Sequence, residues 1–158
     1  MAVELVRIDD RLVHGQVVEG WIPFLRADAV VVASQAAAAD PTQVALMQLA
    51  LPDAIALAVL SPRDAAAHLA SPDCAQRRVL VLVPAPAEAL ALLDAGFPLK
   101  QLNVGGLHYS AGRVQLGRVI FLSDEDRQAL RTLAQRGVLL EGRAVPTDRK
   151  LDLAGLLA

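Results

Sequence analysis

The sequence predicts an α/β fold: a single domain with a mostly parallel sheet covered by helices on both faces. The length of 158 residues suits one domain. Seven short apolar runs alternate with helical patterns along the chain. Two of these runs are continuously apolar, residues 29–33 and, after Arg78, residues 79–83, which is typical of strands buried on both faces.

The first half of the chain contains three predicted strands, each followed by a predicted helix. We expect the strands at residues 4–8, 29–33 and 54–60, and the helices at 16–25, 41–51 and 62–69. In the first helix, Val17, Trp21 and Phe24 are spaced on one face. The other two helices begin with a capping residue followed by proline, at Asp40-Pro41 and Ser61-Pro62.

The second half continues this alternation. We expect strands at residues 78–83, 99–104, 118–122 and 138–145, and helices at 86–95 and 124–136. Gly96 can supply a left-handed cap, Ser123 caps the last helix, and Gly137 ends it. The exception is the stretch 105–117, which predicts a glycine-rich loop or at most a hairpin.

Composition and charge exclude several classes of protein. Hydrophobic residues make up 54% and charged residues 20%, which excludes a disordered chain. A net charge of −2 argues against binding to nucleic acid, which needs a clustered positive field. The chain has one cysteine, Cys74, and no Cys/His cluster with zinc-ligand spacing, so we expect no metal and no cofactor.

Targeting signals are equally sparse. The start of the chain does not resemble a secretory signal, and no apolar stretch reaches the ~20 residues of a membrane helix. We therefore expect a cytoplasmic protein. Its mean hydropathy of +0.42 is compatible with a homodimer but does not require one. The chain contains no GxGxxG, Walker A or GxSxG motif that would favour a nucleotide-binding protein or a serine hydrolase.

The loop after the first strand gathers most of the chemistry-bearing side chains, and ligands of open α/β sheets bind at such carboxyl ends. It contains Arg7, Asp9, Asp10, Arg11 and His14, followed by Gly15 and Gln16. A neutral imidazole is a nucleophile, an arginine fork suits phosphate oxygens, and a helix starting after His14 would aim backbone N–H groups of residues 15–17 at an anion. These parts suit a phosphoryl group. The alternative is structural: an aspartate caps the helix, Arg11 pairs with it, and His14 lies on the surface.

A second loop follows the fifth strand at the same edge of the sheet. It contains Asn103, Gly105, Gly106 and His108. Paired glycines form either an anion-binding nest or a tight turn, and both alternatives stay open. His108 is a candidate contact for a ligand or partner. We interpret His68 as a residue at the C-terminal end of a helix, Cys74 as an unreactive cysteine, and Trp21 as a residue of the core or of an interface.

Several segments together resemble a known family. The sequence RIDDRLVHGQV at residues 7–17 precedes Trp21 and is followed by Asn103-Val-Gly-Gly, Gly112-Arg113, Asp124-Glu-Asp126, Gly137-Val138 and Arg143-Ala-Val-Pro146. The pattern resembles the enzyme IIB subunits of the bacterial phosphotransferase system (PTS), mannose/fructose/sorbose class. The resemblance implies one PTS EIIB type-4 (mannose/sorbose-class) domain over residues 1–158, with an open, mostly parallel seven-stranded sheet.

The resemblance also implies a function, that of a protein-phosphohistidine–sugar phosphotransferase. His14 would accept a phosphoryl group, through Nδ1, from a phosphorylated IIA protein. It would then pass the group to a sugar imported through the membrane subunits IIC and IID, with which the protein would associate peripherally. The residues carried over have three roles: charge neutralisation by Arg7 and Arg11, orientation of His14 or an arginine by Asp9 and Asp10, and backbone donation by Gly15 and Gln16. Asn103, Gly105 and Gly106 would lie beside the site.

Two other functions remain open at this point. One is a regulatory phospho-binding module of an incomplete phosphotransferase system, without turnover of sugar. The other is an unrelated small α/β protein that binds anions. Accumulation of sugar phosphate separates the transport function from both.

Overall fold

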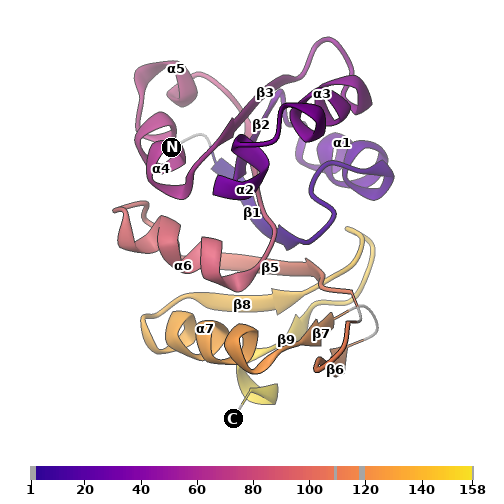
Figure 1. Ribbon diagram of the computed structural model, residues 1–158, viewed down its shortest axis with the longest axis vertical. Coiled ribbons are helices and arrows are strands. Elements are labelled where there is room, and N and C mark those ends of the chain that lie inside the picture. Colours follow the sequence, from indigo (N-terminus) through magenta and orange to yellow (C-terminus); the bar gives the residue numbers. More distant parts are fainter. Residues whose placement is uncertain (1–2, 109, 118–119, 158) are drawn as a thin grey trace.

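The computed structural model describes residues 3–108, 110–117 and 120–157 and contains one seven-stranded sheet. Its strands are β1 (Val3–Asp9), β2 (Ala29–Ala33), β3 (Ala56–Leu60), β4 (Val79–Val83), β5 (Gln101–Gly106), β8 (Leu139–Gly142) and β9 (Leu151–Asp152). They lie in the order β3-β2-β4-β1-β5-β8-β9 (Figure 1). All neighbours are parallel except β8 and β9. The predicted open, mostly parallel seven-stranded sheet is therefore confirmed.

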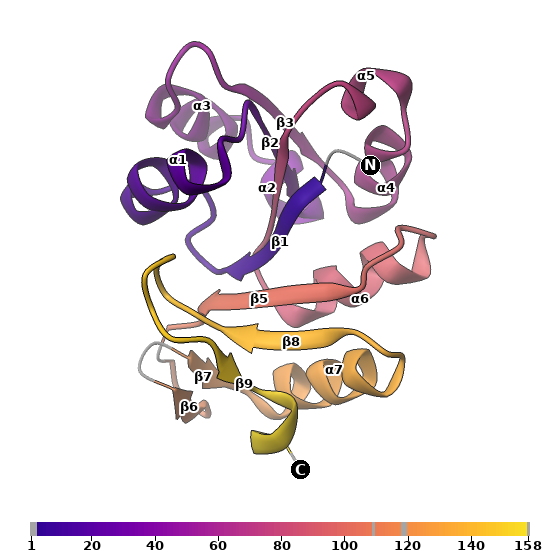
Figure 2. The same ribbon diagram turned by 180° about the vertical axis from the view of Figure 1, so that it is seen from behind.

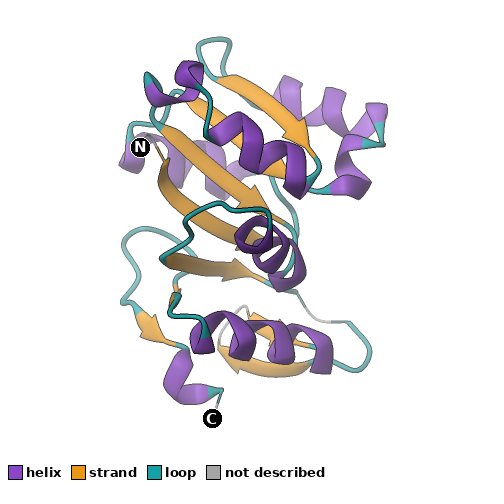
Figure 3. Ribbon diagram, turned by 90° about the vertical axis from the view of Figure 1, so that its left-hand side faces the viewer, coloured by secondary structure: helices purple, strands orange, loops and turns teal. Residues whose placement is uncertain are grey.

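Helices cover both faces of this sheet (Figure 3). One face carries the π-helical turn η1 (Val17–Trp21), α1 (Ile22–Leu25), α2 (Gln35–Ala38) and α3 (Pro41–Ala50). The opposite face carries α4 (Pro62–Leu69), α6 (Pro86–Asp94), α7 (Asp124–Gln135) and the residues flanking the 3₁₀ turn η2 (Ala154–Leu156). The short helix α5 (Pro72–Ala75) follows α4. Because each face is covered, the central strands are buried on both sides, as their continuous apolar runs predict.

The core has two layers. Branched side chains of the strands pack on one side against α4, α6 and α7, with Leu92, Leu130 and Leu133 fully buried. On the other side they pack against η1 and α3, with Trp21 fully buried. The interpretation of Trp21 as a core residue is thereby confirmed.

The seventh strand of the sheet is not the one that the sequence predicts. The expected strand at 118–122 is represented by β7 (Ile120–Leu122), which pairs with β6 (Val114–Gly117) in a separate two-stranded antiparallel sheet and meets Leu107 in one isolated bridge. Residues 118–119 lie outside the described residues. The place at the edge of the main sheet is taken by β9, which pairs antiparallel with β8. Within residues 105–117, Gly105 and Gly106 end β5 and Val114–Gly117 form β6, and the strand that pairs with β6 lies beyond this stretch.

The last predicted strand, 138–145, is too long. β8 ends at Gly142, and the chain leaves the sheet at Arg143. The physical reason is that the carbonyls of Arg143 and Ala144 turn to accept hydrogen bonds from Arg7 instead of continuing the ladder. Two short helices, α2 and α5, are absent from the sequence prediction, and Cys74 is buried in α5.

Most of the predicted helix ends are confirmed. Asp40, Ser61 and Ser123 each accept a hydrogen bond from a backbone N–H of the helix that they cap. Gly96 and Gly137 have φ of +100° and +90°, as left-handed caps require. The helix predicted at 16–25 differs inside, because η1 widens it by one residue per turn before α1 begins.

The topology has a switch point at β1. β1 lies between β4 on one side and β5 on the other, and the chain changes sides of β1 between these two strands (Figures 1 and 2). Ligands of such sheets bind outside the carboxyl ends of the strands at this switch point. In the described part of the chain, none of the helices has the length and apolarity needed to cross a membrane.

Candidate functional site

The candidate site lies at the carboxyl end of β1. The strand ends at Asp9, a turn follows, and helical structure resumes after His14. Leu12, in the middle of this turn, has a φ of +58° and is nevertheless buried. A leucine in the left-handed region costs about 1 kcal/mol, and burial of its side chain offsets this cost. The turn is thus anchored to the core immediately before His14.

The central contact joins His14 and Asp9. His14 Nε2 lies 2.8 Å from Asp9 Oδ2, and the carboxylate is fully buried while the imidazole is 15% exposed. When Nε2 carries the proton and donates a hydrogen bond to Asp9, Nδ1 keeps its lone pair. In this tautomer Nδ1 is the ring nitrogen of His14 with a lone pair that Asp9 does not occupy.

Arg7 is buried completely, beside Asp9 on the same face of β1. Nη1 donates to Asn103 Oδ1 at 2.6 Å and to the Arg143 carbonyl at 2.8 Å. Nη2 donates to Asp9 Oδ2 at 3.2 Å and to the Ala144 carbonyl at 2.8 Å. These four bonds occupy both terminal nitrogens, so Arg7 meets the site through Asp9 and exposes no N–H of them to a ligand.

Aromatic and polar side chains complete the shell around Arg7. Its Cζ lies 4.8 Å from the ring centroid of Trp21, whose Nε1 donates to the same Ala144 carbonyl at 3.0 Å. The guanidinium of Arg143 lies over the same indole at 5.1 Å. Asn103 pairs in register with Arg7 on the neighbouring strand and donates to Glu141 Oε1 at 3.3 Å on the next. A row of buried polar residues thus crosses three strands.

The charges around Asp9 determine its protonation. Burial by itself raises the pKa of Asp9, but the hydrogen bond from His14 and the positive charge of Arg7 outweigh burial and hold the pKa below its ordinary value. Burial is also the main cause that lowers the pKa of Arg7, and Asp9 opposes it. Asp9 is therefore an anion at neutral pH.

Arg11 differs from Arg7 because it lies at the surface. Its side chain is 45% exposed, with Nε 3.8 Å from Asp9 Oδ1 and Nη2 donating to Gln16 Oε1 at 3.2 Å. Its backbone N–H also donates to Asp9 Oδ1. Arg11 is thus the arginine of this loop that has room to meet a ligand.

The start of the following helix contributes backbone donors. The N–H of Val17 donates to the His14 carbonyl and is not available to an anion, contrary to the expectation for this residue. Within the described residues, the N–H groups of Gly15 and Gln16 have no hydrogen-bond partner, and a Cβ on Gly15 would touch nothing within 4 Å. Gly15 and Gln16 therefore keep open space and two donors next to His14.

The glycine pair of β5 forms neither a nest nor a tight turn. Both residues are extended and belong to the strand. Their role is to leave space: a Cβ on Gly105 would lie 1.9 Å from Arg7 Cζ, and one on Gly106 would lie 3.1 Å from Asp9 Oδ1. The absence of these side chains allows Arg7 and Asp9 to lie against the neighbouring strand.

Asp10 points to a different partner. Its carboxylate accepts hydrogen bonds from the backbone N–H of His108 at 2.7 Å and lies 2.5 Å from His108 Nδ1. Asp10 thus orients neither His14 nor an arginine at close range; Arg113 is 3.8 Å away. The structure brings His108 to the site, in line with its candidacy, and it brings in Arg113 as well.

Sequence reasoning missed several contributors. The carbonyls of Arg143 and Ala144 leave no trace in residue type, because any residue supplies a carbonyl. Glu141 did leave a signal, since it is a charged residue inside an apolar strand. Across the described residues, no group of three or more His, Cys, Asp or Glu side chains could hold a metal ion.

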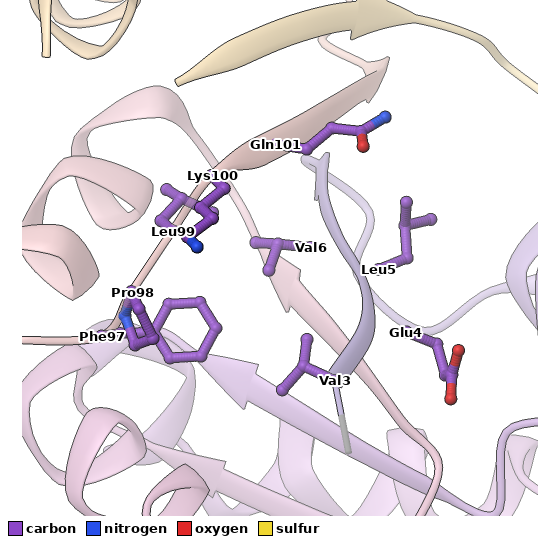
Figure 4. A pocket seen from close by; sticks show the side chains of 9 residues that line it. All are labelled: Val3, Glu4, Leu5, Val6, Phe97, Pro98, Leu99, Lys100 and Gln101. Carbon is purple, nitrogen blue, oxygen red and sulfur yellow. The ribbon is translucent and has the colours of Figure 1, made fainter. Parts of the chain in front are cut away.

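The detected pockets lie away from this cluster. One, of about 210 Å³, lies between the starts of β1 and β5 and is lined by Val3, Val6, Phe97 and their neighbours, with the Glu4 carboxylate turned away from the apolar side chains (Figure 4). Another, of about 450 Å³, lies between the end of α7 and β8–β9. The first is at the amino ends of the strands, opposite the Asp9–His14 pair. Neither of these two pockets is lined by Asp9 or His14.

Comparison with known proteins gives one consistent result. The family model described as "PTS system sorbose subfamily IIB component" matches residues 3–158. The "PTS system sorbose-specific EIIB component" of Lacticaseibacillus casei is 33% identical over 153 residues, 97% of this chain and 93% of that protein. The "PTS system mannose-specific EIIAB component" of Escherichia coli (strain K12) is 31% identical over this whole chain, which spans 49% of that protein. The crystal structure of the IIBSor domain of the Klebsiella pneumoniae sorbose permease superposes with a TM-score of 0.92 at 30% identity, covering 99% of this chain and 96% of that one.

Proposed function

The chain belongs to the sorbose subfamily of IIB components of the phosphotransferase system, and we propose that His14 is the residue on which it carries the phosphoryl group. The protein is a phosphocarrier, the IIB subunit of a mannose-class sugar phosphotransferase system. Its activity is that of a protein-Nπ-phosphohistidine–sugar phosphotransferase. The observation that supports His14 most directly is its 2.8 Å contact with the buried carboxylate of Asp9.

The first step follows from the tautomer that this contact favours. Nδ1 attacks the phosphorus of a phosphohistidine on the donor protein, the new N–P bond forms, and the bond between phosphorus and the donor imidazole breaks. Because Nε2 keeps its proton, the ring of His14 becomes positively charged as Nδ1 is substituted. The anion of Asp9, held at 2.8 Å, stabilises that charge.

The neighbouring groups have distinct roles in this proposal. Arg11, exposed beside Asp9, meets the phosphoryl oxygens with its planar fork of donors. The N–H groups of Gly15 and Gln16 provide two further donors. Arg7 is a positioning residue, because its terminal nitrogens are occupied and its effect on His14 passes through Asp9. Asn103, Gly105 and Gly106 in turn hold Arg7 and Asp9 or leave space for them.

In the second step, His14 passes the phosphoryl group on to the sugar. A sugar hydroxyl attacks the phosphorus, the bond from phosphorus to Nδ1 breaks, and water takes up the hydroxyl proton. The imidazole leaves as a neutral ring because Nε2 still carries its proton. A leaving group that departs neutral, against a carboxylate that already holds it in place, needs little rearrangement in the site.

IIB components act with IIA and with IIC and IID partners. For this chain we extend that general statement: a phosphorylated IIA protein donates to His14, and the IIC and IID membrane subunits present the sugar to it. Work with these partners requires the cytoplasmic side of the membrane and peripheral association with the permease. The partial exposure of the His14 imidazole and the exposed side chain of Arg11 beside it support reaction with large partners.

The proposal is tested by transfer of ³²P from phosphorylated IIA. The wild-type chain is expected to take up acid-labile label, and His14→Ala is expected to take up none. His68→Ala is the matched control, since His68 lies in the last turn of α4 and is expected to label like the wild type. Circular dichroism checks that His14→Ala is folded. Equal labelling of His14→Ala and the wild type would refute the assignment.

A further inference from the structure

A second histidine–aspartate pair lies beside the first. His14 binds Asp9 through Nε2, and His108 binds Asp10 through Nδ1. The two aspartates are consecutive, so their side chains leave the end of β1 in different directions. Each therefore holds a different imidazole, one from the turn after β1 and the other from the connection after β5.

The second pair fixes the start of the turn that carries His14. Asp10 accepts two bonds from His108, and its own N–H donates to the Gly106 carbonyl at 2.8 Å. Arg113 donates to the His108 carbonyl at 2.9 Å, and its Nε lies 3.9 Å from Asp126 at the start of α7. The first residue of the turn is thus tied, through His108 and Arg113, to the amino end of a long helix.

His108 also lies close to the reacting pair. A single Cβ atom added to Gly106 would lie 3.1 Å from Asp9 Oδ1 and 3.2 Å from His108 Cε1. Both side chains therefore border the same small space. The ring of His108 is 43% exposed, and among the described residues its Nε2 has no hydrogen-bond partner, so Nδ1 is the atom through which it acts within this chain.

We propose that His108 is a positioning residue for phosphoryl transfer, which fixes the turn from Asp10 to His14 by holding the Asp10 carboxylate through Nδ1. This inference rests on the proposed role of His14. It differs from a contact between His108 and the phosphoryl group, which would use the free Nε2. A loosened turn displaces His14 Nδ1 relative to the donor phosphorus, and a displacement of about 1 Å costs roughly 100-fold in rate.

Amide side chains separate the two ring nitrogens of His108. In His108→Asn the side-chain NH₂ takes the place of Nδ1 and keeps a donor for Asp10. In His108→Gln the NH₂ reaches toward the place of Nε2 and Asp10 loses its partner. The transfer of ³²P from phosphorylated IIA to the full chain is followed at rising donor concentrations, so that the rate at saturation and the KM for the donor are obtained separately.

We expect His108→Ala and His108→Gln to lower the rate at saturation roughly 10- to 100-fold with little change in KM. His108→Asn is expected to stay within about threefold of the wild type, as is the control His68→Ala. Asp10→Asn is expected to slow the rate like His108→Ala, and the double variant to be no slower than the slower single variant, because both remove one interaction. Thermal unfolding of each variant checks that the slowing is not loss of fold.

The alternatives give other results. Rescue by Gln but not by Asn would show that His108 acts through Nε2 and would overturn the positioning role. Wild-type rates in His108→Ala, or strictly multiplicative effects of His108→Ala and Asp10→Asn, would also overturn it. Failure of the underlying function is recognised separately, because in that case His14→Ala accepts label like the wild type.

Discussion

The guanidinium of Arg7 fills the space that a side chain at position 105 would need. A Cβ built on Gly105 would lie 1.9 Å from Arg7 Cζ and 2.1 Å from each terminal nitrogen. Arg7 also cannot retreat easily, because those nitrogens hold Asp9, Asn103 and two carbonyls. The glycine of one strand and the arginine of its neighbour thus form one structural unit beneath His14.

We expect Gly105→Ala to displace Arg7 and with it Asp9. The free energy of unfolding should fall by roughly 1–3 kcal/mol, the usual cost of an overpacked core, and phosphoryl acceptance should slow as well. Chemical denaturation and ³²P transfer measure the two effects. Gly155→Ala is the control, since a Cβ there would meet nothing within 4 Å, and a loss of stability in it as large as in Gly105→Ala would contradict this explanation.

The two arginines of the loop should separate under mutation. Arg11→Ala is expected to slow transfer by about 10²–10³ with an unchanged melting temperature, because a preorganised donor is lost from an exposed position. Arg7→Lys is expected to lower the free energy of unfolding by about 1–3 kcal/mol, since an ammonium has three donors for four buried acceptors. Thermal unfolding together with transfer kinetics distinguishes these outcomes. An Arg7→Lys variant as stable as the wild type would show that the four hydrogen bonds of the Arg7 guanidinium do not stabilise the fold.

Asp9 should make the fold sensitive to acid. Its folded pKa lies below its ordinary value of 3.8, so the carboxylate stabilises the fold fully above the unfolded pKa. This contribution is lost as the pH falls through the lower folded pKa. The difference in the free energy of unfolding between wild type and Asp9→Asn should therefore be constant from about pH 7 to pH 5 and shrink below pH 4.

Urea denaturation across this range measures that difference. Asp53→Asn, at an exposed turn, is the control and should show no comparable change. A difference that grows on acidification would have the wrong sign for a lowered pKa.

Glu88 should affect the pH dependence of stability in the opposite direction to Asp9. Burial, with a smaller effect of Asp126, raises the pKa of Glu88 above 4.5, and its Oε2 has no partner among the described residues. A raised carboxyl pKa means that stability is greatest at low pH and declines as the pH rises from the unfolded pKa through the folded one. We therefore expect Glu88→Gln to be more stable than the wild type at pH 7, with the gain vanishing below the unfolded pKa. Equal stabilities at neutral pH in urea denaturation would contradict this.

Much of the fold could be predicted from residue types alone. Continuous apolar runs predicted β2 and β4, and a capping residue followed by proline predicted the starts of α3 and α4, because these signals are local. The sequence did not predict that β9 takes the place in the main sheet that we expected for the strand at 118–122. β9 is two residues long, and its place depends on a free edge of β8 that only the folded sheet creates.

The sequence likewise predicted some parts of the candidate site and not others. The loop after β1 drew attention to His14, Asp9 and Arg11 because unusual side chains cluster there. Arg7 looked like one more cation for phosphate, since a sequence does not reveal that a charged side chain is buried at 0% exposure. Its partners at Arg143 and Ala144 are backbone carbonyls of a segment 136 and 137 residues further along the chain.

That separation has a consequence for how the protein matures. During synthesis Arg7 leaves the ribosome 137 residues before Ala144. Until the later segment emerges, the guanidinium of Arg7 lacks the carbonyls of Arg143 and Ala144 that hold it beside Asp9. The framework around Asp9 and His14 is therefore complete only after residue 144 has left the ribosome, although His14 itself emerges about 130 residues earlier.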